Sequence, residues 1–222
     1  MLDEIVPPAV IAVEAFEDPP DVRLYPQEEA LLQKAVTSRR LEFGTARWCA
    51  RRALAKLGLP ATPILPGPHR APIWPDGVAG SMTHCAGYRA AALAHSRDVA
   101  TIGIDAEPDG PLPDGIRDRI ASPEEQSALA ELTAAAPGTS WDKLLFSAKE
   151  STYKAWFPLA QRWLGFMDAS VGINPADGTF TARLLVPGPM LAGRQLTEFH
   201  GRWLIRNGLV VTAIAVPASG TH

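Results

Sequence analysis

Two short stretches of the sequence carry side chains whose types and spacing could support catalysis. Asp105 and Glu107 are two residues apart at the end of a β-like segment, so both carboxylates lie on one face of the strand. Glu150 and Lys154 are four residues apart in a helix-like segment and share one helical face. Carboxylates on one face repel each other unless a cation lies between them. If the fold brings the two stretches together, they form a site for a hard divalent cation and a polyphosphate, as phosphoryl-type transfer requires.

Each pattern taken alone also has a simpler explanation. An Asp-x-Glu pair is common at a solvated strand end, and a Glu–Lys pair on an open helix contributes roughly a few tenths of a kcal/mol. The helix is apolar around its charges, however, which favours a partly covered site over open solvent. In such a site Glu150 is predicted to be a metal ligand or general base and Lys154 to contact phosphate. Lys149 lies about 100° further around the helix.

Basic and hydroxyl side chains in the first half are candidates for phosphate binding. Three arginines recur at spacings of seven and four on an expected helix: Arg40, Arg47 and Arg51. A solvated helical face is the simpler explanation of this strip, and phosphate capture is the functional one. Ser81 and His84 lie at the start of an expected hairpin, although a lone histidine is more often structural.

The composition narrows the class of protein. The chain has 222 residues, 46% of them hydrophobic, which is enough for one large domain or two small ones. A net charge of -3 argues against a dedicated nucleic-acid binder, and the short apolar runs predict no transmembrane helix. Residues 1–4 lack the basic start of a signal peptide, so we expect a cytoplasmic location. Cys49 and Cys85 form no metal or disulfide pattern, and no nucleophilic triad, P-loop or Rossmann motif is present.

Hydrophobic periodicity predicts helices and strands in both halves of the chain. Strands are expected at 9–16, 79–84, 88–94, 99–107, 169–173, 179–186 and 202–216, the last split by a turn at 206–208. Helices are expected from Pro26, over 38–57, after a capping box at Ser122, and from 139–140 to Phe157, where Pro158 should end the last one. A proline-rich linker is expected at 108–123. Each half has a long helix followed by a hairpin, which suggests an internal duplication.

Three motifs together resemble one enzyme family. They are Trp74-Pro75-x-Gly77-x-x-Gly80-Ser81-x-Thr83-His84-Cys85, then Gly103-Ile104-Asp105-Ala106-Glu107, then Phe146-Ser147-Ala148-Lys149-Glu150-x-x-Tyr153-Lys154-Ala155-Trp156. In order and spacing they resemble the 4′-phosphopantetheinyl transferases of the larger, surfactin-type group, in its enterobactin-synthesis-like branch. The resemblance implies an α+β fold of two similar subdomains, residues 1–108 and 109–222, about a pseudo-twofold axis. Each subdomain would have a small antiparallel sheet packed on a long helix, with coenzyme A in the cleft between them.

The resemblance also implies a reaction. Coenzyme A and Mg²⁺ would bind, and a serine hydroxyl of an apo acyl or peptidyl carrier protein would attack the β-phosphorus, releasing adenosine 3′,5′-bisphosphate. The carriers would belong to siderophore, polyketide or nonribosomal peptide synthesis, and one self-contained chain would act as a monomer. Ala106 stands where some relatives have a polar residue, so a water is expected there and the choice between Mg²⁺ and Mn²⁺ stays open.

Residue roles follow from the same resemblance. It implies that Glu150 and Lys154 are catalytic and that the metal ligands are Asp105, Glu107 and Glu150. It implies that coenzyme A is bound by Arg40, Arg47, Arg51, Arg70, Ser81, His84, Lys149 and Lys154. Two alternatives remain: a Mg²⁺-dependent phosphohydrolase acting on coenzyme A or a related pyrophosphate, and a non-catalytic coenzyme A-binding protein.

Overall fold

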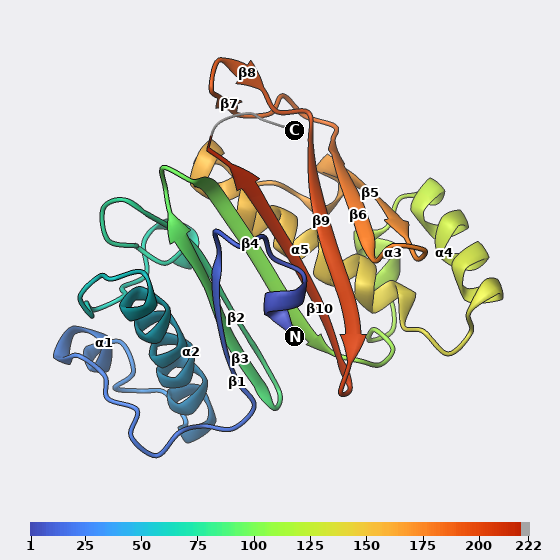
Figure 1. Cartoon of the computed structure of the whole chain (residues 1–222). Coiled ribbons are helices and arrows are strands. Elements are labelled where there is room, and N and C mark those ends of the chain that lie inside the picture. The colour runs from blue at the N-terminus through green and yellow to red at the C-terminus, as the bar shows by residue number, and fades with distance from the viewer. Residues whose placement is uncertain (219–222) are drawn as a thin grey trace.

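The computed structural model describes residues 1–218, which form two antiparallel sheets, each with a long helix on one face (Figure 1). The smaller sheet has the order β1 (Ile11–Ala15), β3 (Tyr88–His95), β2 (Val78–Cys85). Helix α2 (Thr37–Lys56) packs on it because its small and apolar side chains, including Ala50 and Leu54, share one buried cluster with Leu93 of β3. This α+β arrangement agrees with the expected fold class and is consistent with two related subdomains.

The larger sheet has five strands and carries helix α5 (Trp141–Ala160). Its order is β4 (Val99–Pro108), β10 (Leu209–Pro217), β9 (Glu198–Arg206), β6 (Thr179–Leu184), β5 (Ala169–Asn174). The remaining elements are α1 (Pro26–Ala30), α3 (Arg117–Ile120), α4 (Pro123–Ala135), the hairpin β7 (Met190–Leu191) and β8 (Arg194–Gln195), and three 3₁₀ turns, η1 (Leu2–Glu4), η2 (Pro68–Arg70) and η3 (Phe166–Asp168). No helix in the described part of the chain is both long and apolar enough to cross a membrane.

Most of the expected elements are confirmed, with three differences. Pro158 does not end α5, which continues to Ala160 and stops at Gln161, whose φ is 50°. A proline in the final turn is tolerated here because only one backbone hydrogen bond is lost. The short β7–β8 hairpin and α3, which lies inside the expected linker, carried no clear sequence signal. The capping box is confirmed, since Glu125 N donates to Ser122 Oγ at 3.2 Å and Ser122 N donates to Glu125 Oε2 at 2.8 Å.

Strand β4 joins the larger sheet, although its sequence lies in the expected first subdomain. It pairs with β10 along its length, from Leu209 opposite Pro108 to Val216 opposite Thr101. Its other edge faces β2, where side-chain hydroxyls take the place of a backbone ladder. Ile104 N donates to Ser81 Oγ and Ala106 N donates to Thr83 Oγ1, each at 3.1 Å. The expected boundary at 108/109 therefore does not follow sheet membership.

The two faces of β4 have the predicted alternation. Ile102, Ile104 and Ala106 lie in an apolar cluster with β3 and the N-terminal segment. The opposite face meets α5, where a Cβ on Gly103 would lie 1.9 Å from Ser151 O and 2.7 Å from Ala155 N. The hydroxyl of Thr101 donates to Ala155 O at 2.8 Å on the same face. Helix α5 therefore lies directly against the backbone of β4.

We expect Gly103→Ala to lower the free energy of unfolding by about 1–3 kcal/mol or more, because α5 must move away from β4 to admit the methyl group. Chemical denaturation of wild type and variant measures this difference. Gly172→Ala is the matched control, since a Cβ there meets nothing within 4 Å and should change stability by less than about 0.5 kcal/mol. If the two variants were equally stable, the packing of α5 on β4 would not require glycine at position 103.

Candidate active site

Asp105 lies at the centre of the site, where β4 passes beneath α5. Lys154 Nζ donates to Asp105 Oδ1 at 2.8 Å and to Ile104 O at 3.0 Å. The hydroxyl of Thr83 on β2 also donates to Oδ1, at 3.4 Å. The second oxygen, Oδ2, is buried and has no hydrogen-bond partner. Oδ1 of Asp105 therefore accepts hydrogen bonds from a lysine and a threonine, whereas Oδ2 accepts none.

Glu107 and Glu150 complete a cluster of three acids that influence one another. Burial and the charge of Asp105 raise the pKa of Glu107, against the opposing effect of Lys143, whose ammonium lies 3.7 Å away. Burial, Asp105 and Glu107 raise the pKa of Glu150, and Lys154 opposes the increase. The predicted convergence of β4 and α5 is present, since the carboxylates lie close enough to repel.

The residues fit a hard divalent cation, although the side chains must adjust to bind one. Across residues 1–218, no three His, Cys, Asp or Glu side chains stand together as a ready ligand group. Instead, Lys154 forms an ion pair with Asp105, and the carboxylates repel one another. An unpartnered buried carboxylate oxygen and neighbouring carboxylates with raised pKa values form an oxygen-only donor set that Mg²⁺ or Mn²⁺ would stabilise.

A cavity of about 430 Å³ opens beside Glu150, the only one of the three acids that lines it. Glu150, Tyr153 and Lys154 of α5 form one wall, and Ser81 of β2 lies on another. The loop 67–74 completes the lining and includes Arg70. A second cavity of about 210 Å³ shares Glu150 and Tyr153 and continues toward residues 163–166. Glu150 therefore lies where two cavities meet.

The loop 67–74 reaches from the first half of the chain to the helix of the second. The His69 ring meets the Phe157 ring edge-on, with centroids 5.3 Å apart. His69 and Arg70 have φ angles of 52° and 64°, which are unusual for residues with a side chain. Strained backbone of this kind is often found at ligand sites. The loop therefore forms the side of the cavity that connects the first half of the chain to α5, and Glu150 lines the same cavity.

Two family models match the chain in tandem. The 4′-phosphopantetheinyl transferase N-terminal domain matches residues 27–94, and the 4′-phosphopantetheinyl transferase superfamily model matches residues 101–211. The chain belongs to the 4′-phosphopantetheinyl transferases. The second match begins at Thr101, inside β4, so most of this strand belongs to the second match, in agreement with its pairing in the larger sheet.

Relatives at high identity support the same assignment. The chain is 53% identical to the 4′-phosphopantetheinyl transferase Svp of Streptomyces mobaraensis, over 98% of this chain and 90% of that protein. It is 47% identical to the transferase PptT of Mycobacterium tuberculosis, over 91% of this chain and 90% of that protein. Enterobactin synthase component D of Salmonella typhimurium is 35% identical, over 86% of this chain and 78% of that protein. The chain is therefore a transferase enzyme of this family.

The expected basic strip on α2 is only partly open to solvent: Arg40 is exposed, whereas Arg47 and Arg51 are largely enclosed, and all three guanidinium groups hydrogen-bond within the protein. Arg47 is 6% exposed, donates from Nε to Ile64 O at 2.8 Å, and stacks over the Phe43 ring. Arg51 donates to both oxygens of the buried Glu28, at 3.0 and 3.1 Å. Arg40 donates to Leu32 O at 2.9 Å. Sequence reasoning missed Glu28, an acid in the first turn of α1 whose role depends on partners far along the chain.

The other predicted contacts of coenzyme A lie in different surroundings. Arg70 and Ser81 line the larger cavity. His84 is exposed beside Arg39, with 2.7 Å between Nε2 and Nη1, and Arg39 was not among the predicted residues. Desolvation and the charge of Arg39 lower the pKa of His84, which favours the neutral ring. An arginine beside a neutral imidazole provides donors for an anion.

Lys149, predicted to contact coenzyme A, borders the smaller cavity, but its ammonium is held inside the protein. Its side chain is 3% exposed, and Nζ donates to Glu125 Oε2 at 2.8 Å, to Phe166 O at 2.7 Å and to Ala169 O at 3.1 Å. All three N–H donors are therefore used inside the protein. The ammonium points away from the face of α5 that carries Glu150 and Lys154. Its position 100° around the helix was the signal that it faces another direction.

We expect Glu150→Gln to raise the thermal unfolding midpoint when no divalent cation is present. A carboxyl whose pKa is raised by folding destabilises the protein when charged, and this effect grows as pH rises above the ordinary range of a glutamate. The gain should therefore be larger at pH 8 than at pH 5, as measured by calorimetry at both values.

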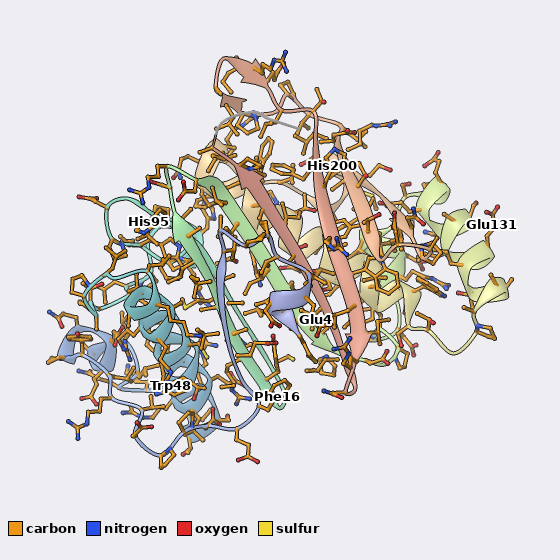
Figure 2. The ribbon with its side chains drawn as sticks, viewed as in Figure 1. Glu4, Phe16, Trp48, His95, Glu131 and His200 are labelled. Carbon is orange, nitrogen blue, oxygen red and sulfur yellow. The ribbon has the colours of Figure 1, made fainter. Side chains whose placement is uncertain are left out.

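Glu131→Gln is the control for this experiment. Glu131 lies exposed on the outer side of α4 (Figure 2), and its replacement should leave the midpoint nearly unchanged at both pH values. A lower midpoint for Glu150→Gln at pH 8 would contradict mutual repulsion within the acid cluster.

Proposed function

We propose that this enzyme transfers the 4′-phosphopantetheine group from coenzyme A to a serine hydroxyl of an apo acyl or peptidyl carrier protein, with Mg²⁺ as cofactor. The observation that carries the proposal is the approach of Asp105 and Glu107 on β4 to Glu150 and Lys154 on α5, the last two of which line a cavity. Three acids and a lysine in this arrangement suit a pyrophosphate substrate, and family membership supplies the transferred group.

The residues proposed to hold the metal are Asp105, Glu107 and Glu150. A bound Mg²⁺ would neutralise negative charge on the pyrophosphate of coenzyme A. Lys154 forms an ion pair with Asp105 and borders the same cavity as Glu150. It would neutralise the charge of the departing phosphate. Arg70, Ser81 and His84 remain proposed contacts of coenzyme A, whereas the internal hydrogen bonds of Arg40, Arg47 and Arg51 favour indirect roles.

The proposed chemistry is a single displacement. The serine oxygen of the carrier forms a bond to the β-phosphorus, and the bond from that phosphorus to the bridging oxygen breaks. Adenosine 3′,5′-bisphosphate leaves with the bridging oxygen, and Glu150 takes the serine proton directly or through a water. A glutamate with a raised pKa is a stronger base than an ordinary one, which suits this role near neutral pH.

The setting of the reaction follows from the same site. Both halves of the site come from one chain, so we propose that the monomer is active. We place the enzyme in the cytoplasm, acting on carriers of siderophore, polyketide or nonribosomal peptide synthesis. The kinship with enterobactin synthase component D favours such pathways.

Intact mass spectrometry of apo carrier proteins, after incubation with the enzyme, coenzyme A and Mg²⁺, tests the proposal. We expect the carrier to gain one phosphopantetheine group. Release of the bisphosphate without any carrier would instead indicate a phosphohydrolase. Binding of coenzyme A with neither outcome would indicate a non-catalytic protein.

Glu150→Gln should reduce kcat by roughly 100-fold or more, because both the general base and a metal ligand lose their charge. Calorimetry should show coenzyme A binding within a modest factor of wild type. Glu131→Gln is again the control and should retain full turnover. Wild-type turnover by Glu150→Gln would eliminate Glu150 as base and as essential ligand.

A further inference from the structure

Lys149 and Glu125 form a buried ion pair behind the proposed active site. Each side chain is 3% exposed, and the charged groups are 2.8 Å apart. The remaining donors of Lys149 go to the backbone oxygens of Phe166 and Ala169, at 2.7 and 3.1 Å. Those two oxygens lie at the start of η3 and just after its end. The ammonium therefore ties both ends of η3 to α5.

Glu125 connects the pair to two further elements. Its Oε2 accepts the backbone N–H of Ser122 at 2.8 Å, at the start of α4, and its Oε1 accepts that of Val171 at 2.7 Å, on β5. One pair of side chains thus joins α4, α5, η3 and β5. Buried ion pairs are often no more stabilising than apolar residues of the same size, so stability alone is a weak explanation for this one.

The segment held by the pair is a wall of the proposed site. Residues 163–166 and Ala169 line the cavity of about 210 Å³ together with Glu150 and Tyr153, and part of Lys149 also borders it. The Trp163 ring lies 4.9 Å from the Tyr153 ring, between centroids. Lys149 precedes Glu150 in the sequence, so one turn of α5 carries both the anchor of this wall and a proposed catalytic group. A shift of η3 would change the shape of the cavity without touching the acids.

We propose that Lys149 and Glu125 are positioning residues that hold segment 163–169 against α5 and so shape the cavity beside Glu150 for coenzyme A. The inference rests on the proposed function for the identity of the ligand. It assigns Lys149 a role through the backbone of η3 and no direct contact with the substrate. The two residues should therefore act as one unit.

The test compares Lys149→Met, Glu125→Gln and the double variant. In each, the KM for coenzyme A should rise roughly tenfold while kcat at saturation stays within about threefold of wild type, as expected for residues that act through others. The double variant should be no worse than the more affected single variant, because both changes remove one interaction. Calorimetric titration with coenzyme A should show the same loss of affinity without turnover.

The double variant also separates positioning from folding. Either single change leaves a buried group without its partner and can lower the thermal midpoint. The double variant has no buried ammonium, and its glutamine oxygen still accepts one of the two backbone N–H groups that Glu125 binds, so its midpoint should recover in part. Recovery together with a raised KM supports positioning. Recovery with a wild-type KM would overturn it.

Two further outcomes would also overturn the inference. Loss of affinity in Lys149→Met with a wild-type KM in Glu125→Gln would mean that the ammonium touches the ligand. A fall in kcat without a change in KM would place the pair in the chemical step. If the wild-type enzyme binds coenzyme A but transfers nothing, the proposed function fails, and the calorimetric affinities alone then decide whether the pair shapes the cavity.

Discussion

The direct contact between α5 and the backbone of β4 at Gly103 is the constraint on which the site depends. A side chain at this position would collide with Ser151 O, so only glycine allows the helix to lie so close. The same contact places Lys154 within 2.8 Å of Asp105. Thr101 reinforces it with a hydrogen bond to Ala155 O. The proposed catalytic groups are thus positioned by a helix and a strand and need no flexible loop to bring them together.

Close packing also creates an electrostatic problem that one bound cation would resolve. Glu107 and Glu150 both have raised pKa values because burial and Asp105 disfavour their charged forms. Lys154 and Lys143 offset part of this repulsion, yet Asp105 Oδ2 stays without a partner. Repulsion among these carboxylates destabilises the site when no cation is bound, and a doubly charged ion would relieve it. The protein keeps this unfavourable electrostatic arrangement at the place where the chemistry is proposed.

Local patterns were sufficient to predict the elements and the face of β4 that carries the acids. Alternation at 101–107 placed Asp105 and Glu107 opposite Ile104, and the capping box at Ser122 located the start of α4. Partners distant in sequence could not be read in this way. Strand β4 pairs with β10, about a hundred residues later, so its sheet was not apparent from its own residues.

For the same reason, the sequence did not reveal the partners of the basic side chains. Arg47 and Arg51 face Glu28, and Lys149 faces Glu125, and these partners lie on other helices. Residue type and spacing show that a basic side chain lies on a helix. They do not show whether its partner is a ligand or a buried carboxylate of the protein. The two local patterns do meet in the structure, where Lys154 of α5 contacts Asp105 of β4, and the roles of these residues are a proposal.

In the proposed site, carboxylates from β4 and α5 share one divalent cation. Titration of Mn²⁺ in the presence of coenzyme A, followed by electron paramagnetic resonance, measures this directly for wild type, Asp105→Asn and Glu150→Gln. We expect one bound ion per wild-type chain and a large loss of Mn²⁺ affinity in both variants, since each element contributes a ligand. Wild-type affinity in either variant would contradict a shared ion between the strand and the helix.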